Sequence, residues 1–141
     1  MIEDDKRQRT DGDLVLDRDD DGNIYSSIPH RVSHYNVDQL DWGHIGPGPA
    51  ELALNILDHF LPPGCDGEKP VSLEKGEISA VTWRLHRAFM ADHLVRLPYE
   101  GGCLHEGRIR RWILEYFSEP KRVPEEEGTD TWWHRLVGRS R

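Results

Sequence analysis

The spacing of hydrophobic positions differs between the first and the middle part of the chain. Leu14-Val15-Leu16 and Ile24-Tyr25 are short β-prone runs, and the polar segment between them contains an Asp-Gly pair. Two such runs around a turn of this kind are typical of a β-hairpin. We therefore predict a hairpin at the start of the domain, followed by an irregular connection over residues 30–41.

Three later segments show the period of an amphipathic helix. Gly46-Pro47-Gly48-Pro49 precedes the first, which we predict over residues 49–60, and Pro62-Pro63-Gly64 ends it. We predict a loop over 62–76, a longer helix over 77–96 and a third helix over 107–117. The apolar positions that support these three predictions are, in order, Leu52, Ile56, Leu57 and Phe60; Ile78, Val81, Leu85 and Phe89; and Ile109, Trp112, Ile113 and Tyr116.

These elements predict the α+β class, with an N-terminal β-hairpin followed by three packed α-helices and a polar tail at each end. A length of 141 residues fits one domain with one hydrophobic core. We assign residues 1–12 to a solvated leader, 13–117 to the domain, and 118–141 to a C-terminal tail. This tail contains a short aromatic segment with Trp132 and Trp133.

Composition and charge narrow the classes of partner. The formal net charge is −8, and it is uneven: residues 1–70 hold 15 acidic and 6 basic residues, whereas residues 71–141 hold 11 and 12. An acidic protein repels nucleic acid, so we disfavour a nucleic-acid partner despite arginines on the second and third helices. No segment has the run of about 20 apolar residues that a membrane span needs. The polar start does not resemble a secretory signal, and we expect a cytoplasmic protein.

The sequence predicts no metal and no cofactor. Cys65 and Cys103 are isolated, and we expect reduced thiols without a shared disulfide or metal. Asp17, Asp19, Asp21 and Gly22 match the opening of a calcium loop, but Ile28 stands where a bidentate glutamate is needed, which favours a hairpin turn with solvated acids. The histidine pairs lack the spacing of zinc ligands, and we expect partly exposed histidines on helix flanks. These pairs are His30 with His34 and His86 with His93.

The segment over residues 42–49 is the most unusual part of the chain. It holds three glycines and two prolines and carries Trp42 and His44 into the start of a helix. Free N–H groups at a helix start can receive an anion, although Glu51 would compete with it. The other interpretation is a structural turn, in which Trp42 fills the core while Gly46 and Gly48 allow close packing.

No catalytic motif is recognisable. The chain has no G-x-S-x-G, no H-E-x-x-H, and no cysteine whose neighbours suggest a lowered pKa. Carboxylate–histidine pairs such as Asp41 with His44 have groups suited to acid–base chemistry, but nothing in the sequence fixes them near a substrate, and we name no catalytic residue.

The run DWGHIGPGPAELALNILD, residues 41–58, resembles the turn and helix that mark an uncharacterised family of small bacterial, archaeal and phage domains. The family pattern is an aromatic WG-Y-G-G-S-GP turn followed by a helix similar to LALAIL. His44, Ile45 and Pro47 depart from it at three turn positions. The resemblance extends weakly to residue 117, and it implies a small standalone domain often carried on mobile elements. It brings no established activity, cofactor or catalytic residue.

Three hypotheses of function follow from the sequence. The first is a non-enzymatic binding or regulatory module, a phage or mobile-element accessory protein that acts on a host protein. The second is a small-ligand protein that binds a nucleotide or other anion at residues 46–49. The third is a hydrolase or transferase that uses His44 and Asp41. The residues predicted to bind a ligand or partner are Trp42, His44, Gly46, Gly48 and Glu51.

Overall fold

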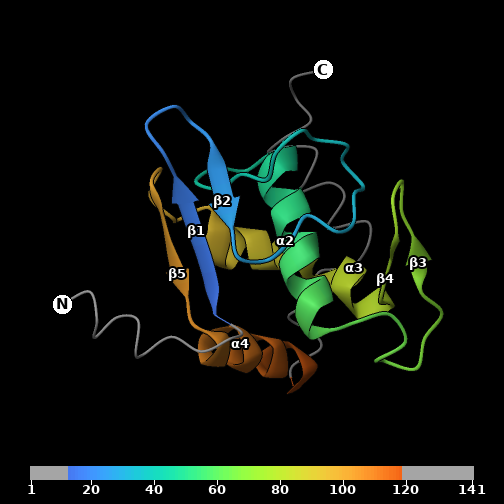
Figure 1. Cartoon of the computed structure of the whole chain (residues 1–141). Helices are drawn as coiled ribbons and strands as arrows, with labels where there is room; N and C mark the ends of the chain where they lie inside the picture. Colours follow the sequence, from blue (N-terminus) through green and yellow to red (C-terminus); the bar gives the residue numbers. More distant parts are fainter. Residues whose placement is uncertain (1–12, 119–141) are drawn as a thin grey trace.

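The computed structural model of the chain describes residues 13–118 as a small antiparallel sheet packed against three helices (Figure 1). The predicted α+β class is therefore confirmed. The predicted hairpin is also present, with strand β1 at Leu14–Arg18 and strand β2 at Ile24–Ser26. The predicted leader, and the tail segment with Trp132 and Trp133, lie outside the described residues.

A third strand, β5 at Gly101–Leu104, was not predicted. It pairs antiparallel with β1, which gives the strand order β2-β1-β5. Gly-Gly-Cys-Leu shows neither alternation nor β-branched residues, so nothing local indicates a strand. Its partner is distant in the sequence, and pairing over such a distance leaves no local pattern.

Helix α2, Pro47–Phe60, is the central element of the fold. The prediction over 49–60 is confirmed, with a start two residues earlier than expected. Figure 1 shows α2 between the three-stranded sheet and a small hairpin of β3 (Val71–Ser72) and β4 (Glu77–Ile78). Every residue from 49 to 58 is buried, polar ones included. The helix is thus covered on all sides and does not carry the single apolar stripe that we expected.

Helix α3, Ala80–Phe89, begins later than the sequence suggested. The predicted start at residue 77 is wrong because residues 77 and 78 belong to β4, and β3 likewise interrupts the predicted loop. The Ser79 side chain accepts a hydrogen bond from the N–H of Thr82 and so caps the helix. A π-helical turn, η1 at Met90–Leu94, continues the helical path almost to the predicted end.

Helix α4, Glu106–Ser118, closes the open end of the core, as predicted over 107–117. The Trp112 ring meets the Phe89 ring edge to face, with centroids 5.1 Å apart. Residues from β1, α2, α3, η1 and α4 share one core cluster, and Trp42 belongs to it. Within residues 13–118, no helix has the length and apolar character that crossing a membrane requires.

Candidate functional site

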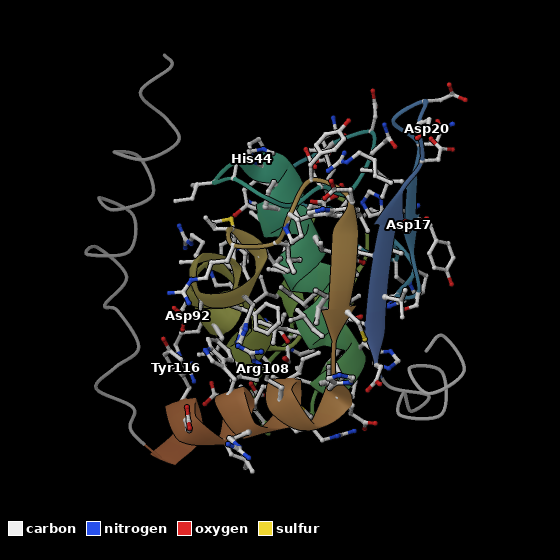
Figure 2. All side chains as sticks on the ribbon, turned by 90° about the vertical axis from the view of Figure 1, so that its left-hand side faces the viewer. Asp17, Asp20, His44, Asp92, Arg108 and Tyr116 are labelled. Atoms are coloured by element: carbon white, nitrogen blue, oxygen red, sulfur yellow. The ribbon has the colours of Figure 1, made fainter. Side chains whose placement is uncertain are left out.

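Three loops meet at one end of the molecule, which we call the turn end. They are the hairpin turn at residues 19–23, the segment 41–46 before α2, and the segment 98–100 before β5. Arg18, at the end of β1, joins them: its Nε donates to the Tyr99 carbonyl at 2.8 Å and its Nη2 to Asp41 Oδ1 at 3.0 Å. Figure 2 shows Asp20 and His44 at this end, with Arg108 and Tyr116 at the opposite end.

The Arg18 guanidinium lies between two aromatic rings. Its central carbon is 4.6 Å from the centroid of the Trp42 ring and 4.0 Å from that of Tyr99. The side chain is only 8% exposed, and its charge is balanced by Asp41. Cation–π contacts of this kind strengthen as the cation loses water. The Arg18 guanidinium therefore packs against the Tyr99 ring, and Tyr99 remains 66% exposed to solvent.

Trp42 anchors the turn from inside. The side chain is buried, and its Nε1 donates to the carbonyl oxygens of Pro98 at 2.9 Å and Tyr99 at 3.2 Å. The next residue, Gly43, has φ +90°, and its N–H bonds to the Leu94 carbonyl at 2.9 Å. A ring buried in this way cannot contact a partner directly. Trp42 has the core-filling position that the structural interpretation of the turn requires.

His44 and Asp41 come close without forming a hydrogen bond. His44 Nε2 lies 3.8 Å from Asp41 Oδ2, beyond normal hydrogen-bond length. Asp41 Oδ1 instead accepts from Arg18 and from the N–H of Trp42 at 2.8 Å. His44 and Asp41 are therefore not hydrogen-bonded to each other in this structure. His44 is 54% exposed and is presented on the surface of the turn.

The start of α2 offers little to an anionic ligand. Pro47 and Pro49, two of its first three residues, carry no N–H. Gly48 packs directly on Asp41, since a Cβ at this glycine would lie 2.7 Å from the Asp41 Cβ. An acidic side chain thus stands beside the first helical turn. Gly46 packs less tightly on His44, whose ring would lie 3.2 Å from an added Cβ.

We expect Gly48→Ala to destabilise the protein by about 1–3 kcal/mol, since the added methyl collides with Asp41 in a packed turn. Gly107→Ala is the matched control: Gly107 is exposed in α4 and nothing lies within 4 Å of its added Cβ. It should unfold at the same urea concentration as the wild type or a higher one. Urea unfolding of both variants makes the comparison. Equal midpoints for Gly48→Ala and the wild type would contradict the close approach.

Glu51 has an internal role. Its fully buried carboxylate accepts the N–H groups of His34 at 2.9 Å and Tyr35 at 2.8 Å, and it contacts His30 Nε2 at 2.7 Å. Burial alone would raise the pKa of Glu51, but hydrogen bonds, led by that from the Tyr35 N–H, outweigh it and lower the pKa. The side chain is therefore ionised and enclosed, and it does not face a partner.

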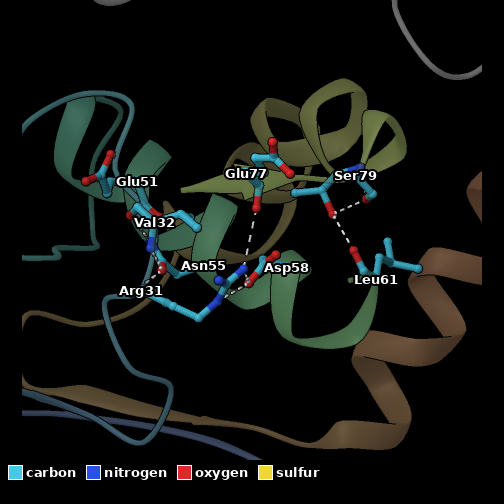
Figure 3. Close-up of polar contacts among 9 residues, drawn as sticks. Arg31, Val32, Glu51, Asn55, Asp58, Leu61, Glu77 and Ser79 are labelled. Atoms are coloured by element: carbon cyan, nitrogen blue, oxygen red, sulfur yellow. Dashed lines mark hydrogen bonds and ion pairs between the residues drawn. The ribbon is translucent and has the colours of Figure 1, made fainter. Parts of the chain in front are cut away.

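Asn55 and Asp58 continue the same polar stripe one and two turns along α2 (Figure 3). Asn55 Oδ1 accepts the N–H groups of Arg31 at 2.6 Å and Val32 at 2.9 Å, and Nδ2 donates to the Val32 carbonyl at 3.0 Å. Asp58 pairs with the Arg31 side chain, whose Nε lies 2.8 Å away. Side chains of this stripe thus hydrogen-bond to backbone groups of the irregular segment that includes residues 30–35, as a neighbouring strand would do in a sheet.

The expectation of partly exposed histidines is wrong for His86 and His93, which are both buried. His86 Nδ1 donates to the Trp83 carbonyl at 2.7 Å, which leaves Nε2 to accept from the Tyr35 hydroxyl at 2.8 Å. Burial lowers the pKa of His86 to about 3 and also lowers that of His93. Both rings are therefore neutral near pH 7.

The acidic hairpin turn has the structural role that the sequence favoured. Asp19 Oδ1 accepts the N–H groups of Asp21 at 2.9 Å and Asn23 at 2.8 Å. These bonds, led by that from Asn23, lower the pKa of Asp19. The carboxylate is thus used to close the turn. Asp19, Asp20 and Asp21 are all exposed, as is Glu100 across the turn end.

Two shallow pockets flank the segment around Pro29, with volumes of about 320 and 240 Å³. The larger includes Arg31, Asn55 and Asp58, and Asp58 Oδ1 is buried without a hydrogen-bond partner among the described residues. Neither pocket was predicted from the sequence. Neither contains a residue of the 41–49 turn, so they add nothing to the ligand site expected there.

The sequence also gave no reason to group Asp13, Cys103 and His105, which converge near the start of α4 with donor atoms within 4.8 Å of one another. Cys103 and His105 stand on either side of Leu104 at the end of β5, and this Cys-x-His spacing was the available signal for the group. It could not be used because β5 itself was not predicted.

No protein-family model, curated protein or solved structure matches the chain. The resemblance of residues 41–58 to the turn–helix family therefore stays a prediction, and function must be argued from the geometry.

Proposed function

We propose that this protein is a non-enzymatic binding module that acts on another protein through its turn end. The observation that carries the proposal is the exposed Tyr99 ring, which packs on Arg18 at an end of the molecule that also exposes acidic residues. Tyrosine and arginine are enriched among residues that dominate binding energy. A surface held in place before binding loses little conformational entropy on association. Asp41 and Tyr99 are held in this way by Arg18 and Trp42.

The charge of the turn end favours a partner with a basic surface. Asp19, Asp20, Asp21 and Glu100 are exposed there, and the one arginine of the cluster is already paired with Asp41. A complementary basic surface would be steered toward this end and would associate faster at low salt. If the mobile-element resemblance holds, the partner is a host protein.

The main alternatives receive less support from the geometry. The hydrolase hypothesis gains nothing from the geometry: His44 Nε2 lies 3.8 Å from Asp41 Oδ2, and Asp41 is paired with Arg18. The anion-binding hypothesis needs free N–H groups at the start of α2, where two prolines and Asp41 stand.

Site-specific photo-crosslinking tests the proposal. A photoreactive phenylalanine analogue is placed at residue 99 and, as control, at Leu114, which is 62% exposed on α4. In cells that make the protein natively, we expect a defined protein adduct from position 99 and none from position 114. With the captured partner, Tyr99→Ala should weaken binding at least about 30-fold, equivalent to about 2 kcal/mol, and Leu114→Ala should not. An adduct from position 114 alone, or from neither position, would overturn it.

A further inference from the structure

A second group of side chains lies at the other end of β1, on the face of the sheet turned away from the core. Leu14 pairs with Leu104 and Val15 with Cys103, and Leu14 and Leu104 are buried in the core. Side chains alternate between the two faces of a sheet, so Cys103 and His105 share the outer face. Continuing the register by one residue sets Asp13 opposite His105. Three different donor types therefore converge at one point.

The separations suit one metal ion. Asp13 Oδ2 lies 3.2 Å from His105 Nδ1, and one donor atom from each of the three residues lies within 4.8 Å of the others. A tetrahedral zinc ion with bonds of about 2.0–2.3 Å sets its ligand atoms about 3.3–3.8 Å apart. Side-chain shifts of about 1 Å would bring all three donors to that spacing, without movement of the strands.

The carboxylate is fixed in position before any ion arrives. The Asp13 side chain is 2% exposed, and its Oδ1 accepts the N–H of Glu106, the first residue of α4, at 2.6 Å. This bond leaves Oδ2 turned toward the imidazole of His105. Supporting bonds of this kind orient metal ligands and raise their affinity. The positive end of the α4 dipole opposes a cation only weakly, because its effect is small beside that of a full carboxylate charge.

We propose that Asp13, Cys103 and His105 form a zinc-binding site. Thiolate and imidazole donors suit Zn²⁺, whereas Mg²⁺ and Ca²⁺ take oxygen ligands. Cys103 and His105 are exposed, so an ion can enter from solvent and a fourth ligand, water or a donor from another molecule, can complete the tetrahedron. The site revises the expectation that the chain binds no metal. It is independent of the turn end, which lies at the opposite end of β1.

Metal titration of the full chain without a histidine tag tests the site. After removal of metal with a chelator, calorimetry should show one equivalent of Zn²⁺ bound, and Cys103→Ser should weaken binding at least about 100-fold. Cys65→Ser is the matched control because Cys65 is the other exposed cysteine. It should bind Zn²⁺ with wild-type affinity.

Cobalt provides a second readout that does not depend on affinity. The Co²⁺ complex should show a sulfur-to-cobalt charge-transfer band in the wild type and in Cys65→Ser, and lose it in Cys103→Ser. His105→Ala should weaken Zn²⁺ binding as Cys103→Ser does. Equal Zn²⁺ affinity in the two cysteine variants, or no binding by the metal-free wild type, would overturn the proposal.

Discussion

Trp42→Ala should lower the free energy of unfolding by about 3–5 kcal/mol, the range for removing a large buried aromatic side chain. The ring is buried in the main core cluster, and its Nε1–H bonds to two carbonyl groups of the 98–99 segment. Small domains are stable by about 5–15 kcal/mol. The substitution therefore removes a large share of the total, and the unfolded population should become measurable under mild conditions.

Trp42→Phe separates packing from hydrogen bonding. It keeps an aromatic ring in the core but leaves the Pro98 and Tyr99 carbonyls without the indole donor, so we expect a smaller loss of about 1–3 kcal/mol. Tyr25→Ala, an exposed position on β2, should change the stability by less than about 0.5 kcal/mol. Urea unfolding followed by far-ultraviolet circular dichroism measures all three. A Trp42→Ala loss no larger than that of Tyr25→Ala would show that the ring does not anchor the turn.

Trp42→Phe also connects stability to the proposed function. Trp42 provides one of the two rings around Arg18, and Arg18 supports Tyr99. A folded Trp42→Phe protein should keep both the stack and the partner. Loss of the partner in a folded variant would mean that the carbonyl bonds, rather than the ring contact, set the position of Tyr99.

The sequence predicted those parts of the fold that depend on local patterns. The β1–β2 hairpin, α2 and α4 each have an apolar period and clear boundaries, and the structure confirms them. Strand β5 and the β3–β4 hairpin were missed because their short sequences gain stability from pairing, which periodicity does not reveal. The start of α3 was placed too early because Ile78 fits a helical stripe equally well, although it belongs to β4.

The candidate site shows the same division between local and distant information. The sequence marked residues 42–49 as unusual, since the spacing of glycine and proline is visible locally. It could not show that Tyr99 and Arg18 complete the turn end, because both come from other strands or loops. Glu51 was predicted to bind a ligand or partner, but its carboxylate is fully buried. The N–H groups that donate to this buried carboxylate come from residues 34 and 35, which carry no recognisable sequence pattern.

Stability should fall as the pH falls below about 6.5, and His86 should be a principal cause. Its pKa is about 3 in the folded protein because of burial, against 6.5 in the unfolded chain. Between these values the unfolded chain takes up a proton and the folded protein does not, so protonation favours unfolding. Each pH unit in this window costs about 1.4 kcal/mol for one such group. At pH 5 the loss from His86 alone is about 2 kcal/mol.

Other groups act in the same direction. The pKa of His93 is lowered by burial, so it adds to the loss in the window just below 6.5. The lowered pKa of Glu51 means that its contribution is present above the unfolded value of 4.5 and is lost as the pH falls through the folded value. As the pH falls, the contributions of the two buried histidines are therefore lost before that of Glu51. A comparison of the stability at pH 7.5 and at pH 5 reports on the two histidine rings and not on the carboxylate.

His86→Gln provides the decisive comparison, because glutamine can bond to the Trp83 carbonyl and the Tyr35 hydroxyl but does not titrate. We expect lower stability at pH 7.5, from imperfect packing, and a pH dependence between 7.5 and 5 that is reduced by about 2 kcal/mol. Urea unfolding at four pH values measures both slopes. Because burial keeps the His86 ring neutral in the folded protein, equal slopes in the two proteins would mean that the folded state lets this ring take up a proton without unfolding.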